Sequence, residues 1–197
     1  DTFEIMMYRS LVGVITVVTL ASLYGTWGQI NRRNFGIQIG RNLAHFTGQN
    51  LWFYAVTVIP LAQVFALEFT SPLWVIVLSP FILGERLTKV RALAAVLGFV
   101  GILCVARPTI AGLNAGVITA ASSAIFFALT IMLTKRLTRS QTITCILFYL
   151  TVTQLVFGVV MAGYDGEIAV PDTAQMPLLL LIGIAGLLAH FCLTNAL

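Results

Sequence analysis

Charged side chains are scarce in this sequence. Aspartate, glutamate, lysine and arginine make up 9% of its 197 residues, whereas hydrophobic residues make up 59%. A soluble domain carries roughly a quarter charged residues, so this composition excludes a soluble globular protein, which could not cover its surface with polar groups. The apolar residues form continuous runs instead of alternating with polar ones, which favours membrane-spanning helices over a barrel.

Groupings typical of enzymes are also missing. The three cysteines (Cys104, Cys145 and Cys192) each lie inside an apolar run, without the spacing of a metal site or a disulfide framework, so we expect buried free thiols. There is no Ser/His/Asp grouping, phosphate-binding loop or glycine-rich dinucleotide turn. We therefore expect no cofactor, no metal and no enzymatic activity, and we do not expect ATP to drive this chain.

Seven apolar segments have about the length needed to cross a bilayer, which is roughly 20 residues. They cover residues 5–23, 43–59, 61–83, 92–106, 113–133, 143–162 and 178–197. The pattern predicts an all-α integral membrane protein.

Basic residues are concentrated in the three loops that must share one side of the membrane. These loops hold nine of the eleven lysines and arginines: Arg32, Arg33, Arg41, Arg86, Lys89, Arg91, Lys135, Arg136 and Arg139. A loop on the opposite side carries Asp165, Glu167 and Asp172. The positive-inside rule places the basic loops in the cytoplasm, so we expect a multi-pass protein of the plasma membrane, the inner membrane of a bacterium. The net charge of +4 is no signal for nucleic acid, because its distribution follows the loops.

The chain also shows a weak internal repeat. An offset of 141 residues places Ile5–Tyr8 on Ile146–Tyr149 and extends over two helices and their loops. The paired helices are an odd number apart, so the halves must be inverted in the membrane. At this offset, the partner of segment 113–133 would lie before Asp1. The partners of segments 61–83 and 92–106 would lie after Leu197. We therefore expect ten helices in the intact protein, of which this chain holds seven.

Four short motifs resemble the EamA-type repeat of the drug/metabolite transporter superfamily. They are Ser71–Trp74, Leu83–Leu87, Gly98–Ile102 and Arg107–Pro108, in that order and spacing. The resemblance implies two inverted five-helix repeats and the export or exchange of small metabolites. On this plan, residues 1–108 form a first repeat lacking its first helix, and residues 109–197 form a second repeat lacking its last two helices.

Glu68 is the foremost candidate for a functional side chain. It lies within segment 61–83, where an unpaired charge costs at least a few kcal/mol. It should therefore face a wet cavity or a partner, or take up a proton. The functional interpretation is a contact to a substrate amine or a proton-coupling carboxylate. In the alternative, the helix begins later and Glu68 lies near the outer interface.

Polar residues of two segments complete the candidate site. The 141-residue offset matches Gln49 with His190, and such a symmetric pair suits a binding site between the repeats. A hydrogen bond that contributes only to packing is the alternative. With its free pKa of about 6.5, the imidazole of His190 could also exchange protons. Asn50, Trp52 and Thr194 lie nearby on the same segments, where Trp52 could line a substrate or simply fill the core.

Pro72 and Pro80 interrupt segment 61–83. Each removes a backbone hydrogen bond and favours a kink, so we expect this helix to act as a gate. A static kink is the alternative.

Three further residues receive more ordinary expectations. Glu85 should form a solvated ion pair in the basic turn that contains it. Arg9 should extend to the lipid headgroups, with anion binding as the alternative. His45 should lie at the cytoplasmic interface.

We therefore predict a secondary transporter that moves a small metabolite across the plasma membrane by alternating access. The EamA resemblance implies that this solute is an amino acid or related amphiphile and that it is exported. Uptake or exchange of a nucleotide-like metabolite is the alternative within the same fold. A membrane enzyme or assembly scaffold without solute flux is the alternative from a different class. The expected partners are a small-molecule substrate and the lipid bilayer, but no nucleic acid, and a homodimer is left open.

Overall fold

The computed structural model describes residues 2–86, 88–106, 114–164 and 168–197, and within these ranges it contains helices and no strand. In chain order the elements are α1 (Thr2–Leu23), the 3-10 helix η1 (Trp27–Gln29), α2 (Phe35–Val58), α3 (Leu61–Glu68), α4 (Ser71–Ile82), α5 (Lys89–Ala106), α6 (Ala115–Thr138), α7 (Ile143–Ala162) and α8 (Met176–Ala196). The predicted all-α class is confirmed.

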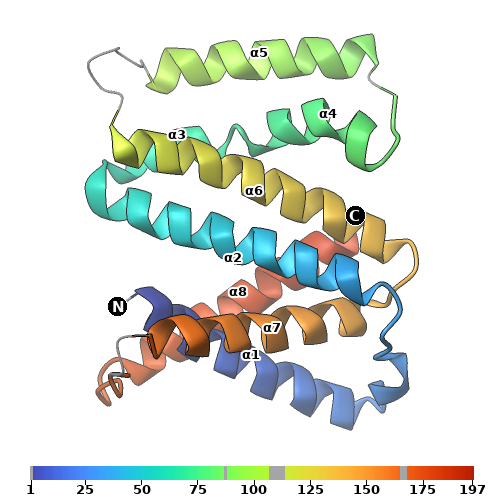
Figure 1. Ribbon diagram of the computed structural model, residues 1–197, viewed down its shortest axis with the longest axis vertical. Helices are drawn as coiled ribbons and strands as arrows, with labels where there is room; N and C mark the ends of the chain where they lie inside the picture. The colour runs from blue at the N-terminus through green and yellow to red at the C-terminus, as the bar shows by residue number, and fades with distance from the viewer. Residues whose placement is uncertain (1, 87, 107–113, 165–167) are drawn as a thin grey trace. The chain divides into compact units, whose positions relative to one another are not determined.

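The chain divides into two compact units (Figure 1). Unit 1 consists of Asp1–Asn42 and Thr134–Leu197, and unit 2 consists of Leu43–Leu133. Helices α2 and α6 each begin in one unit and end in the other. Each unit thus contains residues from both sides of position 108, where we expect the two sequence repeats to meet, and the division into repeats stays a prediction.

Unit 1 is held together by α1, which packs against both α7 and α8 (Figure 1). Glycines allow this close approach. A Cβ atom added at Gly158 of α7 would lie 2.9 Å from the Cα of Met7 on α1, and one added at Gly183 of α8 would lie 2.7 Å from the Cβ of Val12. A buried cluster of Val17, Leu147 and Leu150 forms the apolar core beside them.

Unit 2 combines α3, α4 and α5 with parts of α2 and α6. Helix α5 packs against α3 and α4. Helices α2 and α6 approach closely at Gly48, where an added Cβ would lie 3.1 Å from both Phe126 and Phe127. The core of this unit is formed by Ala55, Ile59, Val64 and Ala120.

Five segments among the described residues are long and apolar enough to cross a membrane. One is the stretch Leu61–Ile82, which comprises α3 and α4, and the other four are α1, α6, α7 and α8. The bounds predicted for α7 are those observed. Helix α2, however, begins at Phe35 and not at residue 43, so the assignment of Arg41 to a cytoplasmic loop is wrong. The chain stays helical through Arg41 because this side chain is buried and hydrogen-bonded inside unit 1.

The segment predicted as one kinked helix is two helices, α3 and α4, which are separated at Phe69 and Thr70. Pro72 explains this position, because a proline ring clashes with the carbonyl four residues earlier, here that of Glu68. Pro80 has a different effect, since α4 continues through it to Ile82. The break therefore belongs to Pro72 and directly follows Glu68.

The turn after α4 agrees with expectation. Gly84 adopts a φ of 68°, a left-handed conformation that suits a glycine after a helix end. The carboxylate of Glu85 accepts from the guanidinium of Arg91 at 2.9 Å with both side chains partly exposed, so the predicted solvated ion pair is confirmed. The predictions that concern Arg107, Pro108, Asp165 and Glu167 lie outside the described residues.

Candidate functional site

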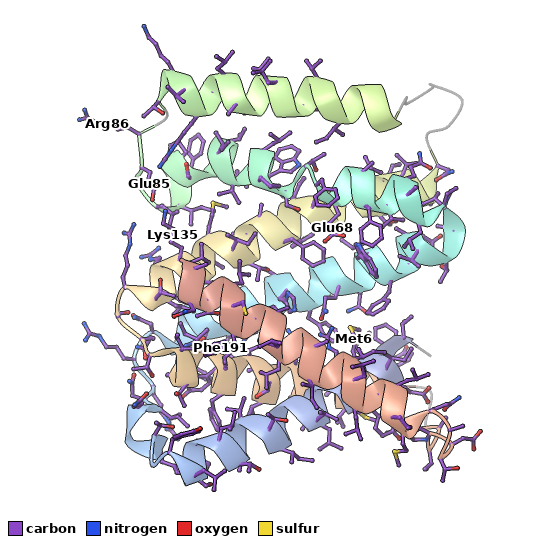
Figure 2. The ribbon with its side chains drawn as sticks, turned by 180° about the vertical axis from the view of Figure 1, so that it is seen from behind. Met6, Glu68, Glu85, Arg86, Lys135 and Phe191 are labelled. Atoms are coloured by element: carbon purple, nitrogen blue, oxygen red, sulfur yellow. The ribbon has the colours of Figure 1, made fainter. Side chains whose placement is uncertain are left out.

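Glu68 ends α3, and its side chain is held by a tryptophan. The indole Nε1–H of Trp52, on α2, donates to Oε2 of Glu68 at 2.7 Å. Both side chains are half-buried within unit 2, among the helices where Figure 2 labels Glu68. A hydrogen bond to a charged acceptor of this kind contributes about 1.5–3 kcal/mol. The two predicted site residues thus form one polar and aromatic pair.

The Trp52 ring also takes part in packing. It meets Phe65 of α3 edge to face, with the ring centroids 6.1 Å apart, and it packs on the core of unit 2. The two interpretations of Trp52 are therefore compatible. The apolar contacts fix the ring, and its N–H orients the carboxylate.

The helix break supplies further polar groups beside Glu68. The hydroxyl of Ser71 donates to the carbonyl of Glu68, and the hydroxyl of Thr70 donates to the carbonyl of Leu67 at 2.7 Å. These hydroxyls satisfy carbonyls that lose helical partners at the break. Glu68 therefore lies where the backbone has irregular hydrogen bonding, within a segment long enough to span a membrane.

The remaining predicted residues of α2 are mostly turned inward. Gln49 is 9% exposed and His45 is 6% exposed, and the His45 ring lies 6.2 Å from that of Phe127. Helix α6 thus covers His45, and its position at the cytoplasmic interface stays a prediction. The amide of Asn50 donates to the carbonyl of Phe46 at 2.8 Å, a bond within its own helix.

The predicted residues of α8 lie in unit 1. His190 lines a polar cavity of about 30 Å³ together with Arg9 of α1 and Gln154 of α7. Thr194, one turn later, is 2% exposed. The predicted contact of Arg9 with lipid headgroups stays a prediction. Arg9 lies against α8, where glycine at position 186 leaves room for its guanidinium.

A polar face of α2 was missed by sequence reasoning. Gln38, Arg41 and Asn42 are 0% exposed within unit 1. Arg41 donates through Nε to the hydroxyl of Thr134 at 3.0 Å and through Nη1 to Oδ1 of Asn42 at 2.8 Å. The amide of Asn42 donates to the carbonyl of Tyr149, and that of Gln154 donates to the carbonyl of Asn42. These bonds tie α2 to α6 and α7.

The sequence did carry a signal for this face. Polar residues recur at helical spacing on one side of α2: Gln38, Arg41, Asn42, His45 and Gln49. All five are buried. A polar stripe of this kind in an otherwise apolar helix points inward, as charged and amide side chains in membrane proteins do.

The structure thus brings Glu68 together with Trp52 in unit 2, and His190 together with Arg9 in unit 1. Gln49 and His190 belong to different units, so their predicted pairing stays a prediction. Unit 1 also holds a larger apolar cavity of about 700 Å³, lined among others by Val17, Leu147 and Phe191.

A family model described as the EamA-like transporter family matches residues 1–107. The chain belongs to this family. The EamA resemblance of the sequence motifs is thereby confirmed. Together with the apolar helices, membership makes the chain part of a multi-pass membrane protein with an EamA-type fold.

Proteins similar to this chain are named as transporters of different solutes. The chain is 25% identical to an S-adenosylmethionine uptake transporter of Rickettsia conorii over 195 residues, which are 99% of this chain and 65% of that protein. It is 27% identical to a riboflavin transporter of Brucella anthropi, over 98% of this chain and 69% of that protein. It is 28% identical to the pseudopaline exporter CntI of Pseudomonas aeruginosa, over 98% of this chain and 67% of that protein. The chain thus spans about 65% of the length of the Rickettsia relative.

A solved crystal structure shares the EamA-type fold. It superposes with a TM-score of 0.72 at 16% identity and covers 98% of this chain and 68% of its own. This likeness concerns the fold alone.

Proposed function

We propose that the intact protein is a secondary transporter that carries a small amphiphilic metabolite across the bacterial inner membrane by alternating access. The observation that carries the proposal is the Glu68–Trp52 pair at the break between α3 and α4. Broken helices with ionisable residues at membrane depth are typical of transport sites. A carboxylate beside an aromatic ring suits the amine of a substrate, which both groups attract.

The substrate class that we propose first is an amino acid or related amphiphile moved outward. Its amine would replace the indole N–H as the partner of Glu68. The pseudopaline exporter among the relatives supports outward movement. Proton exchange or substrate exchange would supply the driving force, because ionisable Glu68 lies within the span.

A nucleotide-like metabolite is the second candidate, taken up or exchanged by the same site. Trp52 favours it, because an indole ring can stack on a base or a flavin ring. The relatives named for S-adenosylmethionine and riboflavin support this class. The two candidates differ in what they require of Trp52, namely a ring face for stacking or only a donor that orients Glu68.

Counterflow in liposomes that contain the intact protein tests the proposal. The panel would hold amino acids, S-adenosylmethionine and riboflavin, and we expect saturable accumulation of at least one labelled solute. Trp52→Phe keeps an aromatic ring without the N–H, whereas Trp52→Leu keeps neither. If the substrate stacks on the ring, we expect counterflow to be retained in Trp52→Phe and lost in Trp52→Leu. Trp27→Ala, in η1, is the control. Turnover of a lipid-linked substrate with no flux of any solute would overturn transport in favour of an enzyme or scaffold.

A further inference from the structure

Unit 1 contains an apolar cavity that the Glu68–Trp52 site does not use. It has a volume of about 700 Å³, and its lining residues come from α1, α7, α8 and the segment around η1. Pockets for organic ligands measure about 300–1,000 Å³, so this space is large enough to hold one. Figure 2 labels Phe191, which belongs to the α8 wall of the cavity.

The walls of the cavity are mostly apolar, and the cavity opens on the surface of unit 1. Val17 of α1 and Leu147 of α7 are buried in the same core cluster. Leu20 of α1 and the α8 residues Leu188 and Phe191 are instead 44–58% exposed although they line the same space. An apolar chain could therefore enter from the side, between α1 and α8, and lie against buried residues.

One end of the cavity is polar. The side chains of Thr26 and Gln29 line it at η1, where the exposed ring of Tyr24 also contributes. Aromatic side chains such as Tyr24 and the partly exposed Trp27 of η1 are typical of the membrane–water interface. This end of the cavity therefore suits the level of the lipid headgroups.

The apolar walls extend from this end to about the depth of one leaflet. On α1 the lining residues run from Tyr24 back to Thr16, which is about 12 Å along a helix axis. One leaflet contributes about 15 Å, half of the roughly 30 Å hydrocarbon core. The cavity thus has the dimensions for an acyl chain that lies along the helices.

A basic loop lies beside the polar end. Arg32 and Arg33 are exposed in the loop between η1 and α2. The amide of Gln141 donates to the carbonyl of Arg33 at 2.9 Å, which fixes this loop at the start of α7. Thr144, three positions after Gln141, lines the cavity. Two positive charges are therefore held next to the polar end of an apolar space.

We propose that this cavity binds an anionic phospholipid of the bilayer. One acyl chain lies between α1 and α8, and the phosphate headgroup lies at η1 beside Arg32 and Arg33. The apolar walls match the chain, and the basic loop matches the charge of the headgroup, as in other basic pockets between membrane helices. This inference goes beyond solute transport and does not depend on it.

Native mass spectrometry of the intact protein tests the lipid site. The protein is released from micelles that contain equal amounts of phosphatidylglycerol and phosphatidylcholine with the same acyl chains. A basic residue near an anionic lipid contributes about fivefold in affinity, so two of them should favour retention of phosphatidylglycerol roughly 10- to 30-fold. Glycerol 3-phosphate, which lacks acyl chains, should not displace it. Equal retention of both lipids, or displacement by glycerol 3-phosphate, would overturn the proposal.

A first pair of variants tests the place of the acyl chain. Leu188→Trp puts a larger side chain into the open side of the cavity and should lower retention of phosphatidylglycerol at least tenfold. Leu178→Trp is the control, because Leu178 is similarly exposed on α8 but is not among the cavity-lining residues. Both changes are at exposed positions, so we expect both variants to fold. Wild-type retention in Leu188→Trp would contradict a chain in this cavity.

A second pair tests the place of the headgroup. Replacing Arg32 and Arg33 together by Gln should abolish the preference for phosphatidylglycerol, while the apolar cavity still retains lipid. Replacing Arg86 and Lys89 together by Gln removes the same charge from the turn after α4 and is the control. An equal loss of preference in both double variants would show a general charge effect and would contradict a headgroup site at η1.

Two further outcomes assign the cavity to another occupant. If neither lipid is retained, as expected when another segment of the intact protein fills the cavity, the proposal is wrong. If Leu188→Trp abolishes counterflow while phosphatidylglycerol stays bound, the cavity serves the transported solute and the lipid site is also contradicted. Selective lipid retention without counterflow of any solute would instead support the lipid site and contradict the transport proposal.

Discussion

The hydrogen bond from Trp52 helps to stabilise the carboxylate of Glu68 inside an apolar segment. The N–H donor offsets part of the desolvation of the carboxylate, and the aromatic ring shields it. The sequence singled out both residues, since each stands out in its apolar run. It could not predict their contact, because the two residues are 16 positions apart and the chain between them reverses direction, so packing decides which side chains meet.

Glu68→Gln tests the role of the charge at this residue. The amide oxygen still accepts from Trp52, so we expect the fold to be retained. Flux driven by a pH gradient in the intact protein should be lost, while substrate exchange stays measurable, because only the proton-carrying group has been removed. Paired measurements of gradient-driven flux and counterflow in liposomes check this. Glu85→Gln is the control, since a partly exposed ion pair contributes at most about 1 kcal/mol. Wild-type pH dependence in Glu68→Gln would remove Glu68 from coupling.

At the scale of helices, the break between α3 and α4 shows what a residue pattern can and cannot locate. Two prolines predict an interruption of the apolar segment. Helix α3 ends before Pro72, whereas α4 continues through Pro80. The difference lies in position. Pro72 is at the start of α4, where its missing N–H costs little, whereas Pro80 lies inside α4.

Pro72→Ala should join α3 and α4. The new N–H and the removal of the ring clash restore helical bonding to the carbonyl of Glu68, so stability should rise by about 1–3 kcal/mol. If the break is a gate, exchange flux should fall about tenfold, which corresponds to about 1.4 kcal/mol in the barrier. Hydrogen exchange at residues 69–72 and counterflow measure the two effects. Pro80→Ala should leave hydrogen exchange at residues 69–72 and counterflow unchanged, because Pro80 lies inside α4 and away from the break. A Pro72→Ala protein with wild-type flux would make the break merely static.

The contact between α1 and α7 is a second feature of helix scale. An added Cβ at Gly158 would meet the backbone of Met7 at 2.9 Å, and a backbone cannot rotate away as a side chain can. Gly158→Ala should therefore force the helices apart and lower the free energy of unfolding by about 1–3 kcal/mol. Thermal unfolding in detergent measures this. Gly101→Ala, on α5 where nothing lies within 4 Å, should change stability by no more than about 0.5 kcal/mol, and equal effects of the two variants would contradict the close packing.

For the whole molecule, composition and apolar runs were sufficient to predict a helical membrane protein, and motifs were sufficient to predict its family. The sequence was less informative about α2. Arg41 was placed in a loop because an arginine in an apolar segment is costly. The buried guanidinium donates to the neighbouring Asn42 and to Thr134, and a partner as distant in the chain as Thr134 is set by tertiary packing. The candidate site was predicted by residue type, but its division between the two units was not.

Membrane orientation is testable by single cysteines introduced after replacement of Cys104, Cys145 and Cys192. Arg33→Cys, Arg86→Cys and Arg139→Cys should all react with an impermeant maleimide only from the cytoplasmic side, because the positive-inside rule retains basic loops there. Tyr164→Cys is the control for the opposite side, since Tyr164 is 90% exposed in the loop after α7. Labelling of the three arginine positions from different sides would contradict both the orientation and the inverted repeat.

The buried polar stripe of α2 also bears on how the protein is made. On insertion scales an arginine costs about 2.5–3.5 kcal/mol at the centre of a helix and less toward its ends, so Arg41, in the second turn of α2, disfavours insertion of this helix by itself. The groups that satisfy Asn42, at Tyr149 and Gln154, are synthesised 107 and 112 residues later. The ribosome therefore releases α2 well before its partners exist. We therefore expect α2 to take its final place only after α7 has been synthesised.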